Sequence, residues 1–197
     1  MGIPIDGIVN PRLADRLTRF TGAAKVVTYY LERQSGVRMV GGRRRATTAM
    51  SWRESRLIRR FLNGIDKLTG LSFERVPSRE EAVMDIYALK RYLDPNVIGS
   101  TFFTKDGYDV TWQNMRRGLV GMDERVTIKH EILHVLGLDH PYGDGFNYRY
   151  DTSDTLMSYF TRRGFDSLTG SDRAALVSLW GTESSGTGSW GTESPVA

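Results

Sequence analysis

The spacing of apolar and polar residues along the chain predicts strands and helices in alternation. Residues 25–32 (KVVTYYLE) are rich in β-branched and aromatic side chains, which favours a first strand. Apolar residues then recur at helical spacing over positions 57–65. Ser51 and Glu54 form a capping-box pattern before this run and Gly70 follows it, so we expect an amphipathic helix between them.

Short apolar runs after this helix predict four further strands. They occupy residues 72–76, 83–89, 97–103 and 108–112. The arginine-rich stretch GGRRR at 41–45 is expected to be a loop. Two more helices are expected at 126–136 and 169–180, the second capped by Thr169 or Ser171.

Composition favours one globular domain. Of the 197 residues, 40% are hydrophobic and 25% are charged, and the absence of cysteine excludes disulfides, thiolate metal sites and cysteine nucleophiles. We expect an N-terminal arm at 1–24, a folded domain at 25–181 and a flexible Gly/Ser-rich tail at 182–197. The arm is open to three interpretations: a packed segment, a remnant of a pro-segment or a docking piece. The pentapeptide WGTES, which occurs twice near the C-terminus, is a duplicated linker or a docking element.

Neither a membrane nor a nucleic acid is an expected partner. No run approaches the roughly 18 uncharged apolar residues of a membrane span, and no N-terminal secretion signal is visible. Asp6 stands where a myristoylation motif needs Ser or Thr. The net charge of +4 includes arginine clusters at 43–45 and 162–163, but no base-reading or stacking motif accompanies them, so we expect solvated loops.

All three histidines of the chain lie within the segment HEILHVLGLDH. On a helix, His130 and His134 lie about 40° apart around the axis, so both imidazoles reach one ion, with Glu131 beside them. Gly137 is able to take a left-handed conformation that ends the helix and lets His140 return as a third ligand. Three neutral imidazoles with one open position are typical of a catalytic zinc site.

This segment matches the HExxHxxGxxH pattern that defines the metzincin metallopeptidases, and average residue usage gives a chance match on the order of one in 10⁵. The segment DTLMSYF resembles the second landmark of that family, the Met-turn, through Met157 and Tyr159. Pro141 and MSYF are similar to the serralysin group, and the order of elements is similar over residues 25–181.

The resemblance implies an α+β fold of the metzincin, or zincin-like, type. Such a fold has a twisted mixed sheet of about five strands, an active-site helix, a backing helix and a C-terminal helix. It also implies a monomeric zinc endopeptidase acting on extended polypeptides, with Glu131 as general base. By the same resemblance, Tyr159 ligates zinc in the resting enzyme and stabilises the oxyanion, while Met157 forms a hydrophobic base under the histidines. The calcium-binding glycine-rich repeats of serralysins are missing, and secretion is favoured by resemblance alone, so the location stays open.

Several other positions have alternative interpretations. Residues 97–103 are either a substrate-binding edge strand or an ordinary hairpin strand. Tyr142, Tyr148 and Tyr150 line the substrate site or pack in a loop. A weak calcium site is conceivable from the oxygen-bearing side chains of Asp144, Asn147, Asp151 and Asp154, although their spacing is not that of an EF-hand. Asp139 and Asp123 are expected to be a solvated loop residue and a helix-start residue without a role.

A different class of function also fits the sequence. The histidines would then hold zinc in a non-catalytic binding or structural module, whose fold persists without turnover.

Overall fold

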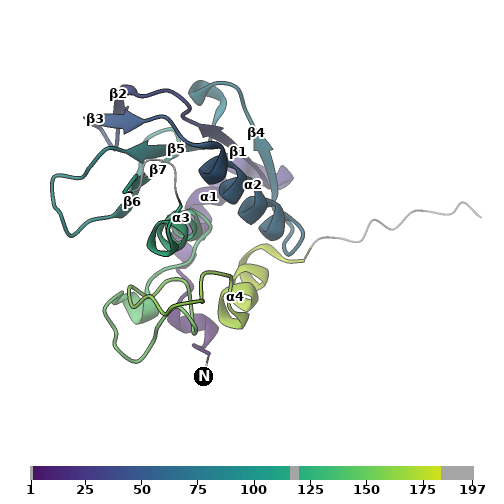
Figure 1. Cartoon of the computed structure of the whole chain (residues 1–197). Coiled ribbons are helices and arrows are strands. Elements are labelled where there is room, and N and C mark those ends of the chain that lie inside the picture. The colour runs from purple at the N-terminus through teal and green to yellow at the C-terminus, as the bar shows by residue number, and fades with distance from the viewer. Residues whose placement is uncertain (1, 116–119, 183–197) are drawn as a thin grey trace, which may run out of the picture.

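A computed structural model describes residues 2–115 and 120–182 of the chain. In these residues one mixed sheet and one set of helices form an α+β fold (Figure 1). The strands are β1 (Val26–Leu31), β2 (Gly36–Val40), β3 (Arg43–Thr48), β4 (Ser72–Arg75), β5 (Met84–Leu89), β6 (Gly99–Phe103) and β7 (Tyr108–Gln113). The α-helices are α1 (Pro11–Thr21), α2 (Trp52–Asp66), α3 (Met122–Val135) and α4 (Gly170–Trp180). Short 3₁₀ turns are η1 (Ile5–Gly7), η2 (Gly22–Ala24), η3 (Arg79–Glu81) and η4 (Pro141–Gly143).

Strand β5 is the centre of the sheet, and all six of its residues are buried. It runs parallel to β1 on one side and to β7 on the other, and β4 is parallel to β1. Strand β6 is antiparallel to β7 and pairs with β7 alone among the described strands. One edge of the sheet, formed by β6, is therefore open for further pairing.

The hairpin of β2 and β3 corrects the prediction of a loop at 41–45. Gly41 and Gly42, with φ of 57° and 71°, form the turn, and Arg43 begins β3, which pairs with the end of β5. The sheet thus has seven described strands rather than about five. Nearly all side chains of this hairpin are exposed or half-buried, and the arginine run of β3 lacks the apolar alternation that marks a half-buried strand.

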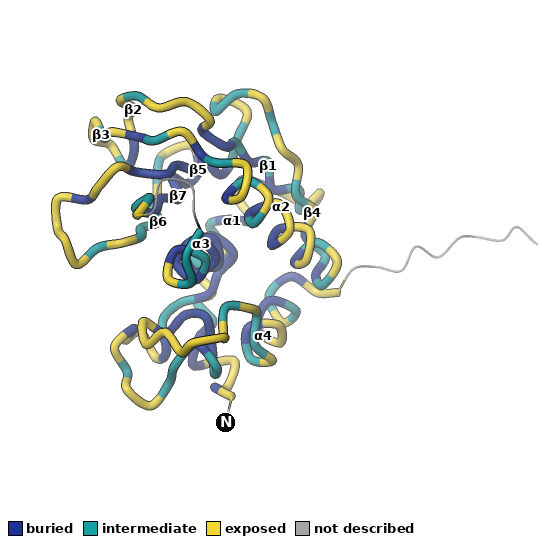
Figure 2. The backbone as a smooth tube through the Cα atoms, in the orientation of Figure 1, coloured by how far each residue is buried: buried dark blue, intermediate teal, exposed yellow. Residues whose placement is uncertain are grey.

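Helices α2 and α4 begin where the capping residues predicted, whereas α3 begins at Met122, before the predicted start, and α1 was not predicted. Ser51 and Glu54 make a complete capping box at the start of α2, and Thr169 with Asp172 does the same for α4. Helix α3 lies between the sheet with α2, which we call the upper half, and the lower half, formed by η1, the segment 136–169 and α4 (Figure 1). Figure 2 shows α3 as largely buried, because both halves pack against it.

The N-terminal segment packs onto the rest of the domain. Ile3, Ile8, Ala14 and Leu17 are buried in the main hydrophobic core. The predicted tail lies outside the described residues from position 183 onward, including the second WGTES copy. No helix in the described residues is long and apolar enough to cross a membrane.

Candidate active site

Helix α3 carries three functional side chains within one and a half turns. His130 and His134 project from the same face, and Glu131 follows His130 directly. His130 retains 4% of its accessible surface and Glu131 retains 7%. The part of the helix predicted to hold a metal is therefore largely shielded from solvent, which strengthens electrostatic interactions there.

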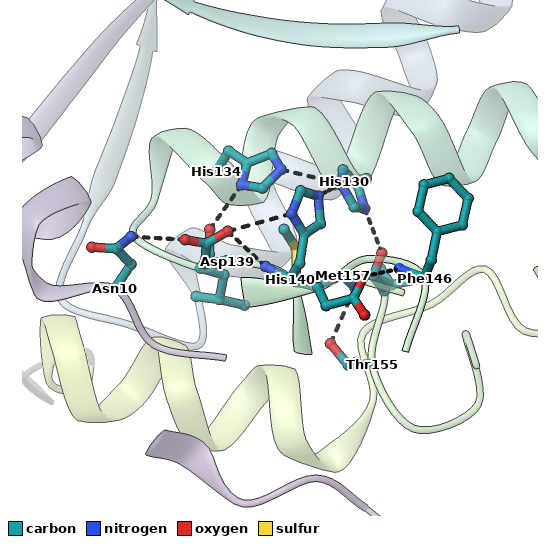
Figure 3. A network of polar contacts seen from close by, with 11 residues as sticks. Asn10, His130, His134, Asp139, His140, Phe146, Thr155 and Met157 are labelled. Atoms are coloured by element: carbon teal, nitrogen blue, oxygen red, sulfur yellow. Dashed lines mark hydrogen bonds and ion pairs between the residues drawn. The ribbon is translucent and has the colours of Figure 1, made fainter. Parts of the chain in front are cut away.

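The three imidazoles converge through their Nε2 atoms (Figure 3). The Nε2 of His130 lies 3.1 Å from that of His134 and 3.2 Å from that of His140. Within the described residues, these histidines form the one group of three or more His, Asp or Glu side chains close enough to share a metal ion. Two nitrogens bound to one tetrahedral zinc at about 2.0–2.1 Å are roughly 3.3 Å apart, so the observed separations fit that ion.

Hydrogen bonds to the other ring nitrogens fix the tautomers of two of these histidines. His130 Nδ1 donates to the carbonyl of Leu156 at 2.8 Å, and His134 Nδ1 donates to the carbonyl of Leu138 at 3.0 Å. A carbonyl oxygen only accepts, so each Nδ1 carries the proton and each Nε2 presents a lone pair. Two lone pairs facing each other at 3.1 Å repel, and a cation between them removes the repulsion.

Burial keeps the three imidazoles neutral. Desolvation lowers the pKa of His130 well below its ordinary value, and the neighbouring His134 lowers it further. Desolvation also lowers the pKa of His134 to about 4 and lowers the pKa of His140. Neutral imidazole is the form that binds a metal, so no proton has to be removed from the rings near pH 7.

The chain reverses between α3 and His140 at Gly137. Its φ is 95°, and a Cβ at this position would lie 2.9 Å from the Leu179 side chain and 3.0 Å from that of Ala14. Glycine is thus required both by the backbone conformation and by the close packing of α1 and α4. This turn brings His140 back to the two histidines of the helix.

Asp139, which was expected to be a solvated loop residue without a role, makes contacts with both His140 and Asn10. Its Oδ1 accepts the backbone N–H of His140 at 2.8 Å and lies 3.5 Å from His140 Nδ1, and its Oδ2 accepts from Asn10 at 2.8 Å. The carboxylate therefore orients the third histidine in the way that outer groups orient metal ligands. The sequence places Asp139 directly before His140. It gives no sign of the contact with Asn10, which lies 129 residues away.

Strand β6 approaches Glu131 closely. The Thr101 hydroxyl contacts two acceptors of Glu131, the backbone carbonyl at 2.7 Å and the carboxylate Oε2 at 3.0 Å. At Gly99 a Cβ would lie 2.4 Å from Thr127 Cγ2 and 2.7 Å from Glu131 Oε1, so only glycine allows this approach. Burial raises the pKa of Glu131 to about 8, while the hydrogen bonds of Thr101 lower it. A nearby cation would lower this pKa further, because opposite charge favours the carboxylate.

The turn that contains Met157 is held by a buried carboxylate of α4. Asp172 Oδ1 accepts from the Thr155 hydroxyl at 2.6 Å, and Oδ2 accepts from the Leu156 N–H at 3.1 Å and from the Thr169 N–H at 2.9 Å. Asp172 and Met157 are both fully buried. Asp172 therefore holds Leu156, the residue whose carbonyl orients His130.

Tyr159 follows this turn and lies beside the histidines. Its ring centroid is 4.7 Å from that of His140 and 5.5 Å from that of His130. The Tyr159 N–H donates to the Gly145 carbonyl at 2.9 Å, and a Cβ at Gly145 would meet the tyrosine ring at 2.5 Å. Burial raises the Tyr159 pKa, with the nearby Glu131 adding to the effect, so the hydroxyl keeps its proton near neutral pH.

A cavity of about 290 Å³ joins these elements. Its walls come from the start of α1, from β6, and from α3 and the segment that follows it. The lining residues are Asn10, Leu13, Gly99, Ser100, Thr101, Phe103, Glu131, His134, Asp139, His140 and Tyr159. The predicted lining residues Tyr142, Tyr148 and Tyr150 are not part of these walls. Tyr142 and Tyr150 instead contact each other, with ring centroids 6.1 Å apart, and Tyr148 is exposed.

The oxygen-rich loop does not gather its carboxylates around one point. In the described residues Asp144, Asp151 and Asp154 form no close acidic group. Asp144 Oδ1 accepts the Phe146 N–H at 2.9 Å, and Asp151 Oδ1 accepts the Ser153 N–H at 2.7 Å. Their hydrogen bonds stabilise local turns, so the suggested calcium site is not formed.

The fold has similarities among solved structures. A chain of the ECX AB5 holotoxin, solved in its GM1-bound form, matches with a TM-score of 0.53 and 18% identity, over 93% of this chain and 88% of that one. Myroilysin matches with a TM-score of 0.46 and 13% identity, over 81% and 87%. No protein-family model matches the sequence, and no curated protein matches it either. The holotoxin similarity shows a shared fold and does not extend to an activity.

Proposed function

We propose that this chain is a zinc-dependent endopeptidase of the metzincin kind. One observation carries the proposal: the lone pairs of His130 and His134 face each other beside a cavity that is lined by His134 and by a buried carboxylate, Glu131. The return of His140 to the same point supplies a third nitrogen. The narrower similarity to serralysins rests on Pro141 and the MSYF sequence.

Zinc suits this set of ligands. Imidazole nitrogens favour zinc among the common metal ions, and a set of three leaves one coordination position open. Bound there, zinc would act as a Lewis acid that polarises a peptide carbonyl and makes a neighbouring water more acidic.

Glu131 is the proposed general base. Its carboxylate lines the cavity and is held by Thr101, which leaves it able to accept a proton from a water in the cavity. The same carboxyl group then delivers that proton to the nitrogen of the departing amine. Near pH 7 this role requires an ionised Glu131, which positive charge among the three histidines would favour.

Tyr159 is proposed to assist through its hydroxyl. The phenol keeps its proton, and its ring contacts those of His130 and His140, so its O–H is available to donate to the substrate carbonyl oxygen as negative charge develops there. In the resting enzyme the same oxygen is proposed as a further zinc ligand. Met157 is proposed to support the histidines by packing.

The proposed substrates are extended polypeptides. The cavity runs alongside β6, and the open hydrogen-bonding edge of this strand is suited to an added strand. Main-chain hydrogen bonds of this kind depend little on the substrate sequence, which fits an endopeptidase. The side chains of Leu13 and Phe103 would contact such a substrate from the cavity wall.

Hydrolysis of denatured casein by wild type and Glu131→Gln tests the proposal. We expect about one zinc per chain in both proteins, cleavage by wild type that a chelator stops, and a rate at least about 10²-fold lower in the variant. Undiminished cleavage by Glu131→Gln would refute the role of this residue.

The alternative is a zinc-stabilised binding or structural module. It predicts that wild type binds zinc, gains stability from it and cleaves no polypeptide. The buried Glu131 beside the histidines argues against this alternative, because burying a carboxylate costs stability and such a module gains nothing from it.

A further inference from the structure

The segment before α1 pairs with the stretch that leads into the third histidine. The Asn10 N–H donates to the Gly137 carbonyl and the Asp139 N–H donates to the Ile8 carbonyl, both at 2.8 Å. Val9 and Leu138 form an antiparallel bridge between these two bonds. Residues 8–10 and 137–139 are thus joined as a short two-stranded element next to the cavity.

The Asn10 side chain links this element to the histidine itself (Figure 3). Its Oδ1 accepts from the Arg12 N–H at 3.1 Å and caps α1, while its Nδ2 donates to Asp139 Oδ2 at 2.8 Å. The other oxygen of Asp139 accepts the His140 N–H at 2.8 Å. One amide therefore connects the start of α1, through Asp139, to the backbone of His140.

The side-chain amide of Asn10 serves both contacts. The cap requires an acceptor and the carboxylate of Asp139 requires a donor, and Asn10 offers both from one short side chain. An aspartate at position 10 would keep the cap but would place two carboxylates against each other. Repulsion between them would turn Asp139 away from position 10 and loosen its hold on His140.

The turn η4, which follows His140, also contacts the N-terminal segment. A Cβ at Gly7 would lie 2.9 Å from the ring of Tyr142, so η1 packs directly against the turn that follows His140. The N-terminal segment thus contacts the chain on both sides of His140. Its docking and the position of that imidazole are coupled.

We propose that Asn10 is a positioning residue for His140, and that the N-terminal segment is thereby part of the metal site. This inference rests on the proposed function for the identity of the ligands. Losing an outer hydrogen-bond partner of a metal ligand commonly lowers metal affinity about 10- to 100-fold. The same loss is expected when the Asn10 contact to Asp139 is removed.

The test compares Co²⁺ and Zn²⁺ affinities of wild type and Asn10→Asp in the full chain, using the cobalt absorption spectrum and competition with a chelator. Asn10→Asp should bind both ions at least about 10-fold more weakly, with an altered cobalt spectrum. Thermal unfolding of the metal-free proteins shows whether the fold is kept. Asn63→Asp is the matched control, because it makes the same change at an exposed site on α2 and should leave affinity unchanged.

The reciprocal double variant, Asn10→Asp with Asp139→Asn, restores a donor and an acceptor between the two positions. It should regain part of the lost affinity, which a general effect on stability would not produce. The inference would be overturned if wild type and Asn10→Asp bound the metals with equal affinity. It would also be overturned if Asn63→Asp lost as much metal affinity as Asn10→Asp, or if the double variant recovered none. Wild type that binds neither ion would overturn the proposed function as well, whereas binding without cleavage would remove only the peptidase activity.

Discussion

The site residues on α3 and those of the lower half are held in place by different means. His130, Glu131 and His134 belong to one helix, whose geometry sets their relative positions. His140 and Tyr159 come from an irregular segment, and their neighbours are fixed by Asn10 and other residues distant in sequence. The backbone positions of the helix-borne groups are therefore set by local structure, whereas those of the loop-borne groups depend on tertiary contacts.

Two buried carboxylates make this contrast testable. Glu54 and Asp172 are each fully buried and each complete the capping box of a helix. Glu54 accepts from Trp112 Nε1 at 3.2 Å and so ties α2 to the sheet. Asp172 accepts from the Leu156 N–H at 3.1 Å and so ties α4 to the turn beside His130.

The largest effect is expected from Glu54→Gln and Asp172→Asn. Each replaces an acceptor by a donor that faces existing donors, and should lower the free energy of unfolding by about 3 kcal/mol. Only Asp172→Asn should also weaken zinc binding, by about 10-fold or more, because the carbonyl that orients His130 moves. Chemical denaturation and zinc titration of both variants provide the measurement. Equal losses of zinc affinity in the two variants would show that the loss comes from lowered stability and not from the contact of Asp172 with the turn beside His130.

A smaller effect is expected from Gly99→Ala, which tests how β6 contacts α3. The added methyl group would meet Thr127 and the Glu131 carboxylate, so we expect about 2 kcal/mol of destabilisation and slower peptide cleavage. Gly64→Ala is the matched control, because nothing lies within 4 Å of a Cβ there and alanine favours a helix. Cleavage by Gly99→Ala at the wild-type rate would show that β6 does not constrain Glu131.

The local features of the fold were predictable from sequence. The capping boxes gave the starts of α2 and α4, and the apolar runs located β1, β4, β5, β6 and β7 within a residue or two. The spacing of the histidines predicted their convergence, because four residues correspond to about one helical turn. Gly137 also has the positive φ that the motif suggested.

The contacts that position the lower half were not predictable in this way. Asn10 and Asp139 are separated by 129 residues, and neither side chain belongs to a periodic pattern. The hairpin of β2 and β3 was missed because Arg43, Arg44 and Arg45 follow one another without alternating with apolar residues. Both cases depend on tertiary pairing, which a single sequence does not encode as a local pattern.

The last effect, which should leave the metal site unchanged, concerns pH and the upper half alone. Burial raises the pKa of Asp85 to about 7, although Arg79 at 3.8 Å lowers it and Asp109 raises it. Between about pH 4 and 7 the folded protein then keeps a proton that the unfolded chain has lost. Stability should fall as pH rises through this window, by up to about 1.4 kcal/mol per pH unit.

Denaturation of wild type and Asp85→Asn at several pH values between 4 and 7 measures this dependence. The amide does not titrate, so the variant should show a shallower decrease in stability with rising pH. Its zinc affinity at pH 7 should equal that of wild type, because Asp85 is remote from the three histidines. A slope as steep as that of wild type would exclude Asp85 as the group responsible.

X-ray absorption spectroscopy of the zinc-loaded full-length protein tests the central claim most directly. We expect a single zinc with three imidazole nitrogens and at least one oxygen at about 2.0–2.2 Å. In His140→Ala one imidazole should be lost. A zinc ion with two imidazoles in wild type, or a spectrum unchanged by His140→Ala, would contradict the claim that helix and loop together form one metal site.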